Sequence, residues 1–322
     1  MTDMHALPEL NTEAPDGYMP SALMRILGRA GARSVLAAPE SDLGLAENMP
    51  FPFLALVGQV EMRVALLLSL INPAVGGVLL IGPRGTGKTT AVRSLASILP
   101  EIEVSTCPEG CLPEDFKREG PAGVCAECAE KLAQGIPITR LDPVKLIELP
   151  LNARLEDVVG GVNERIAVQQ QKIRLERGIL AHADQNLLYV DEVNLLADEI
   201  ADAILDASAA GAYTVRRGAM SGTYRSRFVL IGSMNPEEGS LRPQIMDRFG
   251  LRLAVRGLME NTDERAEVYH RVHAYKTNPR AFIREWAEAI VSTRQEVALA
   301  RDLLPEVTLT DEALQLGLRL VQ

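Results

Sequence analysis

The sequence predicts an α/β protein in which a parallel sheet flanked by helices is followed by a smaller, all-helical domain. Three observations predict this class. Short apolar runs at 78–82, 186–192 and 227–235 have the length of buried strands and are bounded by polar or turn residues. Segments with apolar residues at helical spacing alternate with these runs, which favours a parallel sheet. After about residue 258 only amphipathic helical patterns remain.

The composition is that of an ordinary globular protein without a membrane span. Hydrophobic residues make up 47% and charged residues 24% of the 322 positions, so a substantial core can form. No apolar run reaches the roughly 18 residues that cross a bilayer, and the acidic N-terminus does not resemble a secretory signal. We therefore expect a cytoplasmic protein. The net charge of −10 argues against general binding of nucleic acid.

The N-terminal part divides at about residue 48. Residues 1–48 are rich in Pro, Ala and Glu, and we predict a partly disordered extension with one helical segment at 21–38. From residue 49 the pattern sharpens into a domain that we place at 49–258. Its first expected elements are a helix over 59–71, a strand over 78–82, a helix over 88–99 and a strand over 102–106.

Two later apolar runs complete the predicted sheet. NLLYVDE at 186–192 and RFVLIGSMN at 227–235 are typical of central strands. Between them LLADEIADAILDASAAG carries apolar residues at helical spacing and stops at Gly211, a residue type that commonly ends helices. Residues 259–322 are the expected helical domain.

The strongest functional signal is GPRGTGKT at 82–89, which fits G-x-x-x-x-G-K-[ST] between a buried strand and a helix. Such glycines let the backbone wrap a phosphate chain, and backbone N–H groups and the positive helix end face the anion. Lys88 can reach the outer phosphates and the Thr89 hydroxyl can hold Mg²⁺. A Gly-rich turn with a solvated lysine is the alternative. The predicted nucleotide-binding residues of this stretch are Gly82, Pro83, Arg84, Gly85, Thr86, Gly87, Lys88, Thr89 and Thr90.

Polar residues at two predicted strand ends supply the second half of such a site. In LLYVDE, Asp191 is placed to hold the metal ion, directly or through water, and Glu192 to polarise an attacking water. A solvent-exposed acidic strand end is the alternative, and the phosphate loop upstream favours the functional interpretation. Asn235 ends the next strand and could position the water from the other side, although Asn before Pro236 is also a common turn former.

Two arginines follow in GSLRPQIMDRFG, Arg242 and Arg248. A cation opposite the charge that develops on a γ-phosphate assists hydrolysis, and in a ring of subunits a neighbour can donate it as an arginine finger. An ordinary surface salt bridge accounts for the spacing equally well. The spacing alone leaves both interpretations open.

All four cysteines of the chain fall within 107–128, in the arrangement C-x3-C-x13-C-x2-C. Two close pairs across a short loop suit a tetrahedral, structural zinc site, and the stretch has too few apolar residues for a core of its own. The first spacing is not the commoner C-x2-C, and no histidine lies nearby. Free or redox-active thiols, disulfides and coincidence therefore stay open, although a reducing compartment disfavours disulfides. The candidate ligands are Cys107, Cys111, Cys125 and Cys128.

With these residues in view, the chain resembles an AAA+ ATPase, and more closely the I subunits of magnesium chelatase. The similarity covers about 56–258. The phosphate loop alone indicates only an NTPase, whereas the last two of the matching stretches are much more specific. The stretches are LVGQ, GPRGTGKTTAVRSLASILP, LPLNARLEDVVGGV, LLYVDEVNLL and GSMNPEEGSLRPQIMDRFGLR.

The resemblance implies a motor rather than a chelating site. In that family a ring of I subunits, expected to be a hexamer, hydrolyses ATP with a D-type AAA+ subunit. This drives Mg²⁺ insertion into protoporphyrin IX by a porphyrin-binding H subunit, for chlorophyll or bacteriochlorophyll synthesis. The implied cofactors are ATP and Mg²⁺. The matching positions are Lys88 and Thr89 at phosphate and Mg²⁺, the acidic pair Asp191 and Glu192, the sensor Asn235, the finger Arg248, and Val57 and Gly58 near the adenine.

Two departures from the family pattern bear on these expectations. The hairpin region 213–228 has Arg216 where the family usually shows an acidic residue, and it lacks the usual Asp-Gly turn, which leaves its partner contacts open. No GLRGEL-like segment with the family's second sensor arginine occurs before Gln322, so we expect the helical domain to be incomplete. ATP binding should survive this, whereas hydrolysis and its coupling to motion are left open.

Three other functions remain as alternatives. A MoxR-type AAA+ chaperone would share the ATP site but remodel a protein, and a cobaltochelatase motor would differ in partner and metal. A nucleotide-dependent scaffold would bind ATP and turn it over slowly. The complete set of Asp191, Glu192, Asn235 and Arg248 argues against the scaffold, whereas the missing second sensor arginine leaves it open.

Overall fold

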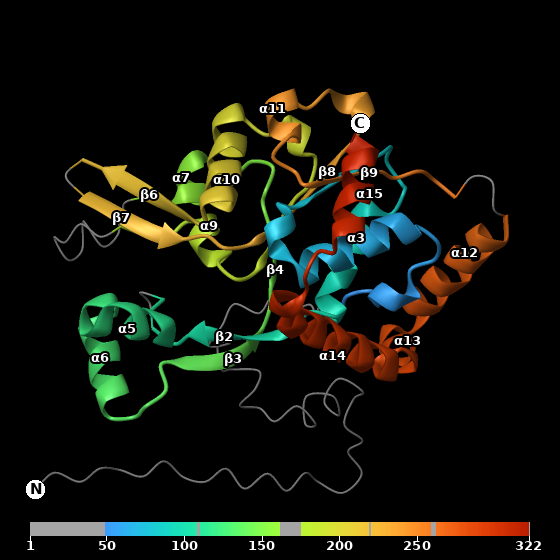
Figure 1. Cartoon of the computed structure of the whole chain (residues 1–322). Coiled ribbons are helices and arrows are strands. Elements are labelled where there is room, and N and C mark those ends of the chain that lie inside the picture. The colour runs from blue at the N-terminus through green and yellow to red at the C-terminus, as the bar shows by residue number, and fades with distance from the viewer. Residues whose placement is uncertain (1–48, 108–109, 162–174, 219, 259–261, 322) are drawn as a thin grey trace, which may run out of the picture. The chain divides into compact units, whose positions relative to one another are not determined.

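The computed structural model of this protein describes residues 49–107, 110–161, 175–218, 220–258 and 262–321 (Figure 1). These residues belong to one compact unit, Met49–Gln322. The extension predicted at 1–48, with its helix at 21–38, lies outside the described residues. The division at residue 258 stays a prediction.

The centre of the unit is a parallel sheet of five strands in the order β4-β5-β8-β1-β9, as the apolar runs predict. The inner strands β1, with the sequence VLLI, and β5, with the sequence LLYV, are apolar over their whole length because helices cover both faces. All carboxyl ends lie at one edge, so residues far apart in sequence meet there. The strands are β1 (Val78–Ile81), β4 (Leu146–Glu148), β5 (Leu187–Val190), β8 (Val229–Met234) and β9 (Leu251–Ala254).

Successive side chains of β1 pack into two different hydrophobic clusters, one on each face of the sheet. Leu79 packs in a cluster with α7 (Leu155–Val159), α9 (Ile179–His182), α10 (Asp198–Ala210) and α11 (Pro243–Met246). Val78 and Leu80 pack on the other face against η1 (Phe53–Ala55), α3 (Val60–Ile71) and α4 (Lys88–Ser94). This alternation fixes the register of β1 and therefore the position from which the following loop starts.

One predicted strand lies outside the main sheet. β2 (Glu101–Ser105) pairs antiparallel with β3 (Thr139–Pro143), and the two form a small sheet of their own. No residue of β2 is fully buried, which explains why it does not join the apolar sheet. The cysteine-rich stretch lies between these two strands and contains α5 (Pro113–Glu119), η4 (Gly120–Gly123) and α6 (Ala126–Ala133). The helix expected at 88–99 ends earlier, because η3 (Leu95–Ser97) follows α4.

A hairpin and a set of helices complete the described part. β6 (Ala212–Arg217) and β7 (Met220–Arg225) pair antiparallel after α10, which Gly211 ends at φ 67°. In Figure 1 this hairpin lies beside the group formed by β2, β3, α5 and α6. Beyond β9 the described residues form helices only, and none of these is both long and apolar enough to cross a membrane. The helices are α12 (Thr262–Thr277), α13 (Pro279–Glu285), α14 (Ala287–Leu303), η7 (Leu304–Glu306) and α15 (Asp311–Val321).

Candidate functional site

The loop between β1 and α4 has the form of an anion cradle. Gly85 and Gly87 adopt φ angles of +79° and +85°, which a residue with a Cβ rarely adopts. A Cβ at either position would meet no atom within 4 Å, so open space lies beside the loop. The loop leads directly into the N-terminus of α4, whose free N–H groups favour a negative ligand.

Lys88 lies buried at the start of α4 and folds onto its own loop. Its Nζ donates to the carbonyl oxygens of Gly82 at 2.6 Å and Pro83 at 2.8 Å. Burial lowers the pKa of Lys88, and the negative charges of Asp191, Glu238 and Glu192 partly oppose this. A cation in this desolvated position is a strong partner for a phosphate oxygen.

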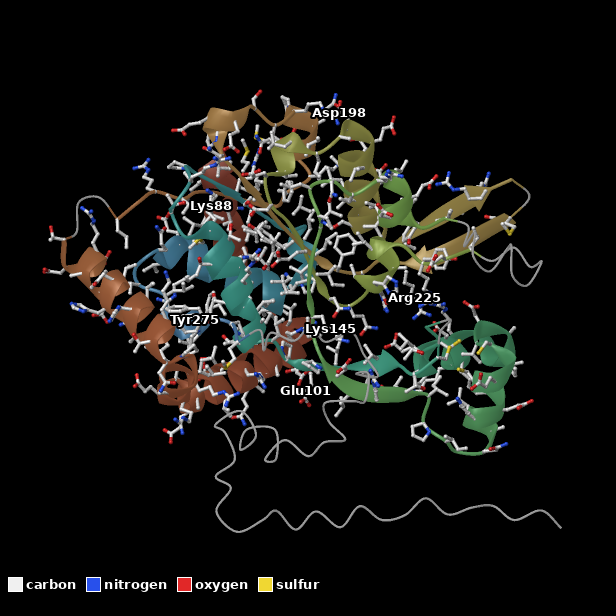
Figure 2. All side chains as sticks on the ribbon, turned by 180° about the vertical axis from the view of Figure 1, so that it is seen from behind. Lys88, Glu101, Lys145, Asp198, Arg225 and Tyr275 are labelled. Carbon is white, nitrogen blue, oxygen red and sulfur yellow. The ribbon has the colours of Figure 1, made fainter. Side chains whose placement is uncertain are left out.

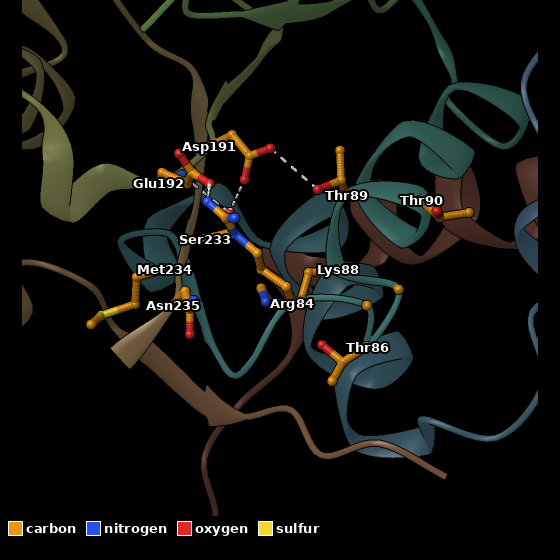
Figure 3. Close-up of a pocket in the computed structure, with 12 residues that line it drawn as sticks. Arg84, Thr86, Lys88, Thr89, Thr90, Asp191, Glu192, Ser233, Met234 and Asn235 are labelled. Carbon is orange, nitrogen blue, oxygen red and sulfur yellow. Dashed lines mark hydrogen bonds and ion pairs between the residues drawn. The ribbon is translucent and has the colours of Figure 1, made fainter. Parts of the chain in front are cut away.

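The first turn of α4 and the end of β5 bring Thr89 and Asp191 together across 102 residues of sequence, with the Thr89 hydroxyl donating to Asp191 Oδ2 at 3.2 Å. The other carboxylate oxygen, Oδ1, accepts a hydrogen bond from Ser233. The Tyr189 hydroxyl lies 3.2 Å from Ser233 Oγ and 3.3 Å from Thr89 Oγ1. Burial raises the pKa of Tyr189, so its hydroxyl stays protonated. Asp191 is thus oriented by two hydroxyl groups at the pocket edge (Figure 3).

Glu192 faces an arginine from the phosphate loop. Arg84 Nη2 lies 2.5 Å from Glu238 Oε1 and 3.5 Å from Glu192 Oε1. Since the Arg84 side chain is largely exposed, these pairs add little to the stability of the fold. Glu192 itself has φ 50°, an unusual backbone conformation for a residue with a Cβ and one that clusters at functional sites. Figure 3 shows the side chains of Arg84 and Glu192 at the same pocket.

Asn235 and Arg248 have different positions. Asn235 is buried, lines the pocket and accepts the Glu237 N–H at 3.3 Å, so it is also the turn former that its position before Pro236 allows. Arg248 is half exposed, lies 3.8 Å from Asp206, and is absent from the residues that line the pocket. Within a single chain Arg248 therefore makes the surface ion pair that the sequence left open.

Two adjoining cavities flank the phosphate loop. The polar one, of about 220 Å³, contains most of the predicted phosphate, metal and water-positioning residues. The second, of about 420 Å³, is mainly apolar and includes Val57, whereas Gly58 lies next to it in sequence without lining it. Both cavities are lined by Gly85, Thr86, Gly87 and Thr90. A charged compartment joined to an apolar one fits a nucleotide, with its phosphates in the first and its base in the second.

Several residues of this site were not predicted from the sequence. Tyr189 and Ser233 orient Asp191, Glu238 holds Arg84, and Arg265 and Arg271 of α12 line the apolar cavity. The two-residue spacing of Tyr189 and Asp191 gives a weak signal, because alternate strand residues share a face. Ser233 could be identified as a partner of Asp191 only once the pairing of β5 with β8 was known. In that pairing Val190 lies opposite Gly232, so the next residues, Asp191 and Ser233, come together.

The four cysteines come together away from these cavities. Their sulfur atoms all lie within 4.8 Å of one another, and none forms a disulfide. Cys107 and Cys125 are 4.0 Å apart at Sγ, and the Cys125 N–H donates to Cys111 Sγ at 3.2 Å. Burial raises the pKa of the Cys111 thiol to about 11. None of the four lines either cavity.

Comparison with known proteins gives consistent relatives. The chain is 44% identical over 266 residues to the "Magnesium-chelatase subunit ChlI homolog" of Methanocaldococcus jannaschii, covering 82% of this chain and 71% of the relative. It is 40% identical over 275 residues to the "Magnesium-chelatase 38 kDa subunit" of Rhodobacter capsulatus, covering 85% of this chain and 75% of the relative. Identity to the Synechocystis "Magnesium-chelatase subunit ChlI" is 38% over 278 residues, covering 86% of this chain and 75% of the relative.

A solved structure agrees with these relatives. The chain resembles a subunit in a cryo-EM model of the complex between BchI and BchD of magnesium chelatase, with a TM-score of 0.55 and 39% identity. The similarity covers 80% of this chain and 77% of that one. No family model matches the chain.

Proposed function

This chain belongs to the family of magnesium-chelatase I subunits, and from that premise we propose that it is the ATP-hydrolysing motor subunit of a magnesium chelatase complex. It is thereby a component of an enzyme complex that inserts Mg²⁺, the substrate metal, into protoporphyrin IX. We assign the insertion itself to a porphyrin-binding H subunit, because the two cavities beside the phosphate loop fit a nucleotide.

The observation that carries this proposal is the contact between Thr89 and Asp191 at the mouth of the phosphate loop. A hydroxyl from the helix that follows the phosphate loop and a carboxylate at the end of another strand of the same sheet are the two protein ligands that a nucleotide-bound Mg²⁺ takes in P-loop NTPases. The same pocket contains Lys88, Glu192 and Asn235. The residues therefore fit ATP with Mg²⁺.

Each residue contributes a separate step. When bound, Mg²⁺ screens the charge of the β- and γ-phosphates. Lys88 would exchange its two carbonyl partners for phosphate oxygens, and Asn235 would hold a water molecule in line with the γ-phosphate. Glu192 would polarise that water once Arg84 releases it, since the two lie 3.5 Å apart in this structure.

Hydrolysis is also assisted by a cation opposite the charge that develops on the γ-phosphate, and among the described residues Arg248 does not line the pocket of its own chain. Arg248 is half exposed and loosely paired, which leaves it available to a neighbouring subunit. We assign it the role of arginine finger in a homo-oligomeric ring, expected to be a hexamer. A D-type AAA+ subunit is the proposed partner, because the similar solved structure is a complex of BchI with BchD. A structural zinc ion at the four cysteines is a separate proposal and does not depend on the ATPase activity.

The experiment that tests the motor function is a comparison of ATP turnover between the natural chain and Glu192→Gln, with a D-type subunit present. Loss of a general base commonly lowers turnover by roughly 10²- to 10⁴-fold, while ATP binding should remain. Turnover of the natural chain no higher than that of Glu192→Gln refutes the motor. Addition of a competent H subunit and protoporphyrin IX should then give ATP-dependent Mg²⁺ insertion, and its absence argues against the chelatase assignment.

A further inference from the structure

We propose that Cys107, Cys111, Cys125 and Cys128 bind one structural Zn²⁺ ion, and that this ion makes the α5–α6 segment a rigid support for the β6–β7 hairpin. The proposal goes beyond the ATPase function, because none of the four cysteines lines the nucleotide cavities. It rests on the sulfur geometry, on the chemistry of the ligand set and on the contacts between the segment and the hairpin.

The geometry of the sulfur atoms is that of a tetrahedral site. A Zn–S bond is about 2.3 Å long, so four sulfur ligands around zinc lie about 3.8 Å apart. All four sulfur atoms lie within 4.8 Å of one another, and the pair Cys107–Cys125 is at 4.0 Å. Only a small contraction of the cluster is needed around an ion.

The chain prepares the ligands locally. Gly110 adopts φ +70° and donates its N–H to the Cys107 carbonyl at 3.0 Å, a tight turn that returns Cys111 towards Cys107. Cys125 precedes α6 and Cys128 lies in its first turn, so the short helix holds both of these cysteines in one place. The Cys125 N–H also donates to Cys111 Sγ. A ligand set of four thiols and no carboxylate selects zinc over the hard cations Mg²⁺ and Ca²⁺.

The hydrophobic cluster around the sulfur atoms has too few residues to stabilise the fold of this segment by itself. Apart from the cysteines, the cluster contains Ile138, Val124 and Leu132. The underlying sheet has only the two strands β2 and β3, which is marginal without further support. A bound ion contributes the missing folding free energy.

A buried carboxylate between the two cysteine pairs joins this segment to the hairpin. Asp115 of α5 is 3% exposed, accepts the Leu112 N–H at 2.9 Å and pairs with the guanidinium of Arg225. Arg225 is the last residue of β7, and Figure 2 shows it facing the segment that carries the sulfur atoms. The buried Asp115 carboxylate needs Arg225 in place, because loss of the arginine leaves a buried charge without a counter-charge.

A second arginine makes a parallel link. The Arg177 guanidinium lies against Gly110 and 5.9 Å from the centre of the Tyr224 ring in β7. Both contacts with β7 start within the cysteine-rich stretch. One runs from Gly110 through Arg177 to Tyr224, and the other joins Asp115 of α5 to Arg225. Order in this stretch therefore determines order at the base of the hairpin.

The first test is metal analysis of the full chain purified without chelator. One zinc ion per chain is expected, with release of zinc when the thiols are modified by a mercurial reagent and loss of zinc in the quadruple Cys→Ser variant. Less than a tenth of an equivalent of zinc together with four freely reactive thiols would overturn the site, as would a full equivalent of iron in place of zinc.

The second test is hydrogen exchange of the β6–β7 amides. Removal of zinc from the natural chain should increase their exchange, and return of zinc should restore protection. Asp115→Asn should keep the zinc and still increase hairpin exchange, whereas Lys131→Gln, which removes an exposed ion pair of α6, serves as the matched control. Hairpin exchange that does not respond to zinc removal overturns the support role. Binding of a fluorescent ATP analogue should stay unchanged throughout, which separates this proposal from failure of the ATPase function.

Discussion

The replacement Ser233→Ala tests how the pocket holds its metal-binding carboxylate. Ser233 is 1% exposed and its hydroxyl donates to Asp191 Oδ1, while Oδ2 keeps its bond from Thr89 at 3.2 Å. Alanine removes one of these two bonds, together with the 3.4 Å bond that Ser233 Oγ accepts from the Glu192 N–H, and leaves the loop and Lys88 in place. Asp191 then loses part of the orientation that it needs to bind Mg²⁺.

The magnitude follows from the charge of the acceptor. A hydrogen bond to an ionised group contributes about 1.5–3 kcal/mol net, and about 1.4 kcal/mol corresponds to tenfold in affinity. The half-saturating Mg²⁺ concentration should therefore rise by roughly 10- to 100-fold, the range seen for groups that orient metal ligands. The assay is ATP turnover as a function of free Mg²⁺ at saturating ATP, with a D-type subunit present.

Two controls separate this effect from a general loss of stability. Thr214→Ala removes an exposed hydroxyl pair with Thr223 on the hairpin and should leave the Mg²⁺ dependence unchanged. Tyr189→Phe removes the 3.2 Å contact with Ser233 but keeps the Ser233–Asp191 bond, so its effect on Mg²⁺ should be smaller. A half-saturating concentration for Ser233→Ala within about twofold of the natural chain would refute the positioning role.

Two further replacements probe binding and assembly. Lys88→Ala should abolish measurable binding of a fluorescent ATP analogue at micromolar protein, because the buried cation is lost, and binding within about threefold of the natural chain would contradict this. The Arg248→Ala variant should bind ATP like the natural chain but hydrolyse it slowly. When it is mixed with Glu192→Gln chains, turnover should partly recover, since the second variant can donate its Arg248 to an intact site. No recovery in rings shown to be mixed contradicts the finger role.

The sequence predicted the parallel sheet because strands buried on both faces are apolar throughout, as in VLLI of β1 and LLYV of β5. It was less informative about β2, whose position outside the main sheet depends on its pairing with β3. The three residues of β4 are too few for a periodic signal, and only pairing with β5 places them in the sheet.

For the site, the sequence determined the chemistry. A phosphate loop, an acidic pair and a cysteine cluster can each be identified from neighbouring residues, because local spacing carries the motif. The tertiary structure decided which residues act together. It placed Ser233 at both Asp191 and the Tyr189 hydroxyl, Arg84 between Glu192 and Glu238, and Arg225 at Asp115. These contacts join positions tens of residues apart or more, and strand order and side-chain packing bring them together, neither of which a local pattern encodes.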